Sequence, residues 1–172
     1  MINLTSDNFK RRFPDIGLAL EPDELTALLD LFDVQYVEAA ESLIIAGTIT
    51  DALYFVWDGE LDVLMRDDNH EYKVATIEEG ELLGEISLLS PGPATATVRS
   101  EAGCVALHLD VDSLEQFWIA HPHAASVFLR AINKLVTKRI LHADEILRSV
   151  THARDTNTLK QAQNALLQGK LN

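Results

Sequence analysis

Short apolar segments separated by turn residues fill residues 34–111, and they restrict the chain to a few folds. β-Branched and aromatic residues dominate stretches such as ALYFVWDGELDVLM, which begins at Ala52, and glycines recur between the segments. A spacing of roughly 8–12 residues predicts an antiparallel sandwich or jelly roll of about six or more strands. The pair Asp58-Gly59 predicts a type I′ hairpin turn between two of these strands. Strands do not alternate with helical patterns, so we expect no parallel sheet.

Helical patterns flank the β-rich region on both sides. In residues 4–33, capping residues precede leucines at helical spacing, which predicts short helices. The stretch DSLEQFWIAHP predicts a helix that begins at Asp112 or Ser113 and stops at Pro122, before a long helix over 124–150. The resulting division is an N-terminal helical segment (1–33), a β-roll (34–111), C-terminal helices (112–150) and a tail (151–172), predicted as a short helix or a mobile segment.

The balance of charge excludes several classes of partner. With 27 acidic and 14 basic residues the chain carries a net charge of −13, whereas a nucleic-acid-binding protein needs clustered cations. No apolar run approaches the ~18 residues of a membrane span, and the N-terminus lacks the apolar core of a secretory signal. Cys104, the single cysteine, lies in an alternating apolar stretch, which favours a buried thiol in a reducing compartment. We therefore expect a cytoplasmic protein that contacts neither membrane nor nucleic acid.

One loop has the composition of an anion-binding site. Residues 82–100, LLGEISLLSPGPATATVRS, are typical of a strand, a turn of glycine and hydroxyl residues, and a second strand. Small residues allow backbone N–H groups to converge on an anionic oxygen. The loop nevertheless contains no lysine or arginine before Arg99, at its far end.

Two motifs, AGTITDALYFVWDGELDV and GELLGEISLLSPGPATATVRS, resemble the cyclic nucleotide-binding domain family. The resemblance extends from about Leu25 to Val150, and Gly47 and Gly59 match glycines that turn barrel hairpins in that family. It implies a mostly β fold with flanking helices, namely a double-stranded β-helix jelly roll followed by a long C-terminal helix. The chain is similar to the sensor domain of the catabolite-activator group. We expect no DNA-binding domain after it, since only about 22 residues follow Val150.

The second motif matches the phosphate-binding cassette of that family. Gly84 and Glu85 match its glycine and glutamate, and the glutamate accepts a hydrogen bond from the ribose 2′-hydroxyl. Ile86 follows, and Ser87 stands where a small residue offers its backbone N–H to the cyclic phosphate. The resemblance implies that the ligand is a cyclic nucleotide such as cAMP. Its further predicted contacts are Ala94, which replaces the phosphate-pairing arginine, Thr95 beside it, and Asp144 on the long helix near the adenine amino group.

The alanine at position 94 removes the charge that pairs with the phosphate. A charge-assisted bond of this kind is worth about 1.5–3 kcal/mol, so its loss weakens binding by roughly one to two orders of magnitude. In a regular strand Arg99 lies on the face opposite Ala94, so we expect Arg99 to form a structural ion pair. Lys73 and Arg66, from a neighbouring hairpin, remain candidate replacements.

No pattern in the chain indicates catalysis or a metal centre. His121 and His123 flank a proline at a helix break, and the cluster of Glu78, Glu79 and Glu81 is typical of a solvated turn. We therefore expect a non-enzymatic regulatory domain that binds a cyclic nucleotide weakly or a related ligand. The alternative is a ligand-free interaction module with a degenerate site. In both cases the apolar stripe from Ile140 to Val150 predicts a homodimer, and an unidentified protein partner would receive the output.

Overall fold

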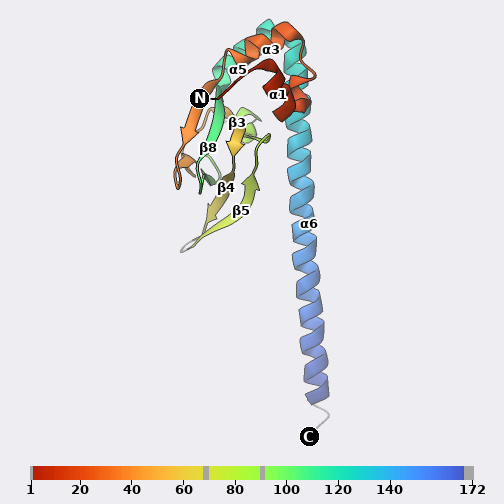
Figure 1. Cartoon of the computed structure of the whole chain (residues 1–172). Coiled ribbons are helices and arrows are strands. Elements are labelled where there is room, and N and C mark those ends of the chain that lie inside the picture. Colours follow the sequence, from red (N-terminus) through yellow and green to blue (C-terminus); the bar gives the residue numbers. More distant parts are fainter. Residues whose placement is uncertain (1, 68–69, 90–91, 169–172) are drawn as a thin grey trace. The chain divides into compact units, whose positions relative to one another are not determined.

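The computed structural model describes the backbone of residues 2–67, 70–89 and 92–168 (Figure 1). Its helices are α1 (Ser6–Arg12), α2 (Pro14–Gly17), α3 (Pro22–Leu29), α4 (Glu85–Leu89), α5 (Val111–Ala120) and α6 (Pro122–Gln168). Its strands are β1 (Asp33–Val37), β2 (Ser42–Ile44), β3 (Ala52–Gly59), β4 (Leu61–Arg66), β5 (Glu71–Ile77), β6 (Leu82–Leu83), β7 (Thr97–Arg99) and β8 (Cys104–Asp110).

The described strands form two four-stranded sheets, in the orders β1-β8-β3-β6 and β2-β7-β4-β5. Every strand pairing within them is antiparallel, as the sequence predicts. Both sheets contribute to one buried apolar cluster, which fills the roll between them. Its members are Val37, Ile44, Ala52, Tyr54, Val56, Leu61, Ile77, Leu83, Val98, Cys104 and Ala106. The prediction of a mostly β jelly roll with flanking helices and a long C-terminal helix is confirmed.

Strand β3 is buried on both of its faces. Alternate side chains of a strand point to opposite faces, and here Tyr54 and Val56 enter the roll interior. Phe55 instead packs among aromatic rings of the flanking helices, with ring centroids 5.1 Å from Phe13 and 5.9 Å from Phe9. The continuous apolar run in this part of the sequence therefore reflects a strand between two apolar layers.

The prediction of a hairpin at Asp58-Gly59 is wrong. Strands β3 and β4 lie in different sheets, so the chain crosses between the sheets at this point. Gly59 has a φ of +83°, and a Cβ there would lie 2.7 Å from the carbonyl oxygen of Gly103. A glycine is therefore required here for two reasons: the backbone is left-handed, and it approaches the paired strand β8 closely.

A buried carboxylate joins α3 to the first turn of α6. Glu24 Oε2 accepts hydrogen bonds from the backbone N–H of Glu21 and from His123 Nδ1, both at 2.9 Å. Burial raises the pKa of Glu24, but the hydrogen bonds from His123, Glu21 and Ala124 and the charge of His123 outweigh it, so the pKa is lowered. His123, considered above as a metal ligand, is thus a partner of Glu24.

Helix α6 begins at Pro122 and remains helical to Gln168, beyond Val150, where the sequence predicts the long helix to end. Residues 151–168 contain neither glycine nor proline, so nothing in the backbone chemistry stops the helix. The chain divides into two compact units, residues 1–129 and 130–172. In the described residues, no helix combines the length and the hydrophobicity that crossing a bilayer requires.

Cys104 is 6% exposed and lies within the roll interior. Burial, with a smaller effect from the charge of Asp58, raises the pKa of its thiol to about 11. The prediction of a buried thiol is confirmed, and at neutral pH this group stays protonated.

Truncation of Phe55 should cost the fold a large share of its stability. Because Phe55 is fully buried among aromatic rings, we expect Phe55→Ala to lower the free energy of unfolding by about 3–5 kcal/mol. Urea denaturation measures the change. The control is Tyr36→Ala on β1, whose aromatic side chain is 59% exposed, and a similar loss in both variants would contradict the packing described for β3.

The Glu24 contacts predict a component of acid sensitivity. Since the pKa of Glu24 is lower when the protein is folded, its contribution to stability is complete above the ordinary value of 4.5 and is lost as the pH falls through the folded value. We expect Glu24→Gln to be less stable than the wild type near neutral pH and to lose less stability on acidification. Unfolding at a series of pH values measures this, with Asp23→Asn, an exposed carboxylate of the same helix, as control. Equal pH slopes in the wild type and Glu24→Gln would contradict it.

Candidate functional site

The candidate site is the loop from β6 to β7, residues 82–100. The sequence predicts a strand, a turn and a strand, and the structure adds a short helix, α4, directly after Gly84. Residues 90 and 91, in the middle of the loop, lie outside the described residues. The helical turn brings Glu85, Ile86 and Ser87 together at the start of the loop, and Ala94 and Thr95 follow in its second half.

Gly84 determines how the first half of the loop packs against the roll. Its φ is +91°, and a Cβ at this position would collide with the backbone carbonyl oxygen of Ala52. The close approach to β3 places Glu85 inside the molecule, where it is 3% exposed. Ile86 is 55% exposed, so this predicted site residue presents its side chain to solvent, while Ser87 is half-buried.

The second half of the loop is attached to a turn near residue 47. Gly47 N–H donates to Ala94 O, and Ala94 N–H donates to Thr48 O, each at 2.8 Å. The methyl group of Ala94 packs against the roll interior, whereas the Thr95 side chain is exposed. The residue that stands at the family's arginine position therefore faces the interior.

The cations nearest in sequence to the loop are paired with carboxylates. Arg99 Nη2 lies 2.9 Å and 2.8 Å from the two carboxylate oxygens of Glu71, which confirms the predicted structural ion pair. Lys73 Nζ lies 2.8 Å from Asp62 Oδ1, and this hydrogen bond raises the pKa of Lys73. Arg66 is exposed at the end of β4.

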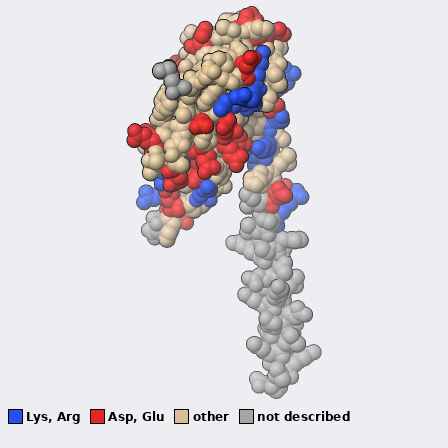
Figure 2. Space-filling view, viewed as in Figure 1, with Lys and Arg blue, Asp and Glu red and all other residues tan. Residues whose placement is uncertain are grey.

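Further carboxylates act on the Lys73 pair, since the charges of Glu60 and Glu101 also raise the pKa of Lys73. Asp62 also accepts a hydrogen bond from Thr76 Oγ1 at 3.0 Å, so its carboxylate is held in place within the sheet. Figure 2 shows acidic side chains in several groups on the visible face of the roll, among larger uncharged areas and a few basic side chains. A phosphate that approaches this protein, with its net charge of −13, is repelled at long range.

Asp144, the predicted contact of the adenine amino group, lies on α6 in the second compact unit. Its Oδ2 is 2.8 Å from Arg148 Nη2, one helical turn further along, and the side chain is half-exposed. A role for Asp144 in base recognition stays a prediction.

Sequence reasoning missed the turn that anchors the loop. Beyond the bonds at Ala94, Ala46 N–H donates to Thr97 Oγ1 at 3.1 Å, and Ile49 forms an isolated bridge with Pro93. The glycine of AGTIT signals a turn, but its partner lies about 45 residues away in the sequence, and no local pattern encodes that pairing. Among the described residues, no three histidine, cysteine, aspartate or glutamate side chains gather as metal ligands.

Comparisons with known proteins agree on one family. A sequence model of the family described as "Cyclic nucleotide-binding domain" matches residues 34–121. Over 150 residues, the chain is 30% identical to the human potassium/sodium hyperpolarization-activated cyclic nucleotide-gated channel 2. This alignment covers 86% of the chain but only 16% of the channel's length.

Solved structures show the same fold. A cyclic nucleotide-binding domain from Methylobacillus flagellatus superposes with a TM-score of 0.75 at 19% identity, over 84% of this chain and 85% of that one, which shows the fold alone. The PKA regulatory domain of Toxoplasma gondii, co-crystallised with cAMP, superposes with a TM-score of 0.59 at 26% identity, over 65% of this chain and 44% of that one.

A comparison of two glycines with similar φ values distinguishes the steric cost of the close approach at β3 from the cost of backbone strain alone. Gly47 and Gly84 have φ values of +84° and +91°, but a Cβ on Gly47 would have nothing within 4 Å. We expect Gly47→Ala to cost about 1–2 kcal/mol of stability from left-handed strain, and Gly84→Ala to cost distinctly more. Chemical denaturation measures both, and equal losses would show that the contact with Ala52 does not constrain the loop.

Proposed function

Because the chain belongs to the cyclic nucleotide-binding domain family, we propose that it is a non-enzymatic sensor whose cassette binds a cyclic nucleotide such as cAMP weakly. The members of this family are regulatory domains, and the match covers the β-roll together with the cassette. A bound nucleotide would act by favouring one conformation of the domain over another, since a ligand shifts only an equilibrium between states that it binds unequally.

The observation that carries the proposal is the alanine at position 94. Its side chain faces the roll interior, where the family pattern has an arginine, and a methyl group offers a phosphate no charge. Arg99 and Lys73, the nearest candidate replacements in sequence, are engaged with Glu71 and Asp62. Binding would therefore depend on backbone dipoles and on Glu85, and we expect it to be weaker by roughly one to two orders of magnitude than with an arginine in place.

The roles that the family assigns to the other cassette residues are part of this proposal. Glu85 would accept the hydrogen bond of the ribose 2′-hydroxyl, and its buried position at the start of α4 supports such a fixed contact. The backbone N–H of Ser87 would face the phosphate, and Thr95 would stand beside it. Asp144 would contact the adenine amino group.

We also propose that α6 mediates a homodimer. Ile140 and Leu141 on this helix are 62% and 63% exposed, an exposure that aliphatic side chains in a stable monomer generally avoid in clusters. Ile140 opens the heptad-like stripe from residue 140 to residue 150, which supports pairing with the same helix of a second copy, and Leu141 adjoins this stripe.

The second candidate is a ligand-free interaction module. The packed roll interior favours it, because Ala94 itself belongs to the apolar side chains that line the cluster. In this case the domain would signal through a protein partner, and the cassette would be only a connection between β6 and β7.

Ala94→Arg separates the two candidates. We expect calorimetric titration with cAMP to give weak binding for the wild type and binding about 10–100-fold tighter for Ala94→Arg, because the guanidinium restores a charge-assisted bond to the phosphate. Ala102→Arg, at an exposed turn outside the cassette, adds the same charge and should leave the affinity unchanged.

Thermal melts without ligand show whether each variant is folded, which matters because Ala94 packs on the interior. If folded Ala94→Arg binds neither cAMP nor cGMP, the sensor proposal fails and the interaction module is favoured. If the wild type binds cAMP as tightly as Ala94→Arg, the assignment of weak binding to position 94 fails.

A further inference from the structure

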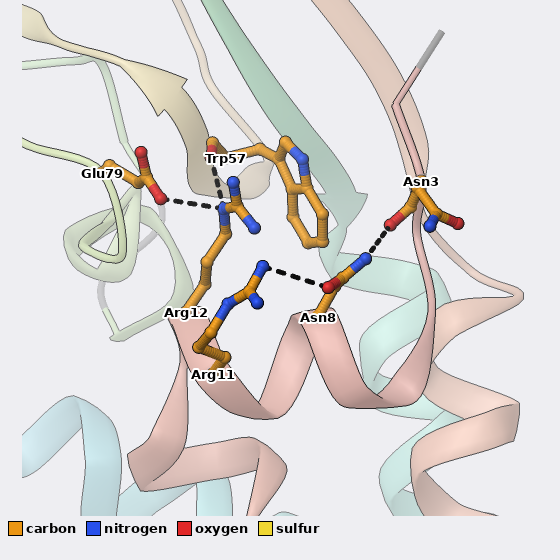
Figure 3. Close-up of polar contacts among 6 residues, drawn as sticks. All are labelled: Asn3, Asn8, Arg11, Arg12, Trp57 and Glu79. Atoms are coloured by element: carbon orange, nitrogen blue, oxygen red, sulfur yellow. Dashed lines mark hydrogen bonds and ion pairs between the residues drawn. The ribbon is translucent and has the colours of Figure 1, made fainter.

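The last residue of α1 contacts the strand and the turn that precede the cassette. The Nε–H of Arg12 donates to the carbonyl oxygen of Trp57 at 2.8 Å, and Nε also lies 2.9 Å from Glu79 Oε1 in an ion pair. The guanidinium carbon also lies over the Trp57 ring, 4.5 Å from its centroid. Figure 3 shows the Arg12 side chain reaching from α1 to both partners. Only 19% of this side chain is exposed, so these contacts are screened less than an ordinary surface pair.

The turn of residues 78–81 is the segment that Arg12 holds. Its own backbone is joined to β3, because Gly80 N–H donates to Val56 O at 2.9 Å and Val56 N–H donates to Glu81 O at 3.0 Å. A Cβ on Gly80 would lie 2.8 Å from the carbonyl oxygen of Arg12, so a glycine here lets the end of α1 approach closely.

A short path connects this turn to the cassette. Only β6, which is two residues long, separates the turn from Gly84, and Gly84 is itself pressed against the backbone of β3. A two-residue strand forms few ladder bonds, so β6 alone holds its ends weakly. The contacts on either side of β6 therefore determine the position of Glu85, the first residue of α4.

We infer that Arg12 is a positioning residue for the cassette: by holding the 78–81 turn on β3, it fixes the start of α4 and the place of Glu85. This inference rests on the proposed function insofar as it concerns a ligand. A planar guanidinium is suited to the position because one face can stack on an indole while the edge donates to a carbonyl and pairs with a carboxylate. The ammonium of a lysine could retain the ion pair with Glu79 only.

The arrangement also links α1 energetically to the cassette. If the ligand binds best when the turn is held, then loss of the Arg12 contacts lowers the affinity for the ligand. By reciprocity, the bound ligand stabilises the contacts between α1 and the turn. A structural change at the N-terminal helix would thus alter the affinity of the site.

Arg12→Gln tests the inference, with Arg11→Gln as its matched control. Arg11 is the neighbouring arginine of the same helix, and its Nη2 donates at 3.1 Å to Asn8 Oδ1 within α1 (Figure 3). Hydrogen–deuterium exchange of the full chain without ligand is the first readout. We expect Arg12→Gln to accelerate exchange of the 80–88 amides about fivefold or more and to leave β8 unchanged, because only a local opening is made easier. Arg11→Gln should change neither segment.

Unchanged exchange at 80–88 in folded Arg12→Gln would overturn the inference, as would equal acceleration in Arg11→Gln or across β8. If Arg12→Gln does not fold, Glu79→Gln takes its place, since it removes the ion pair and leaves the bond to Trp57. Faster exchange at 80–88 in that variant supports the inference, and no change overturns it.

The second readout is cAMP affinity in the Ala94→Arg background. We expect the added Arg12→Gln change to weaken cAMP by roughly three- to tenfold, Arg12→Lys to restore part of the loss, and Arg11→Gln to have no effect. Full affinity in the Arg12→Gln double variant would overturn the positioning role. If Ala94→Arg itself binds no cAMP, the proposed function fails, while the exchange experiment still decides whether Arg12 positions the loop.

Discussion

The fold depends on a strand that is buried on both sides. Tyr54 and Val56 of β3 close the roll interior, while Phe55 and Trp57 meet the aromatic residues of the flanking helices. The backbone of the same strand also receives Gly84 and the turn of residues 78–81. Any shift of β3 would therefore disturb the core, the helical layer and the candidate site together, which makes it the reference against which the cassette is positioned.

Much of this architecture could be predicted from the sequence, because the signals are local. Period-two alternation places Val98 toward the interior and Arg99 away from it, and the structure agrees with that division. Ala94 also packs on the interior, but it precedes β7, which begins at Thr97, so the alternation of a regular strand does not explain its orientation. The Asp58-Gly59 pair misled because a turn dipeptide shows where a strand ends but not whether the next strand pairs with it. Contacts such as Glu24 with His123 join residues far apart in the chain, and no single-sequence pattern encodes them.

The electrostatics of the cassette follow from how the chain distributes its few cations. Arg12, Lys73 and Arg99 each pair with a carboxylate that belongs to the roll or to the turn before the cassette. A cation already committed in this way would have to break its pair before it could meet a phosphate, so the gain from the new contact would be partly cancelled. The lack of a charge at position 94 is therefore not easily compensated by these paired side chains.

The shape of the cassette and its capacity to pair with a phosphate are separable properties in this chain. Gly84 packs on Ala52, Ala94 exchanges backbone hydrogen bonds with the turn at Gly47, and Arg12 holds the preceding turn. None of these contacts uses a charged side chain at position 94, so the backbone contacts that shape the loop do not depend on a charge there. It follows that the choice between a sensor and an interaction module rests on one side chain within a loop whose geometry other residues maintain.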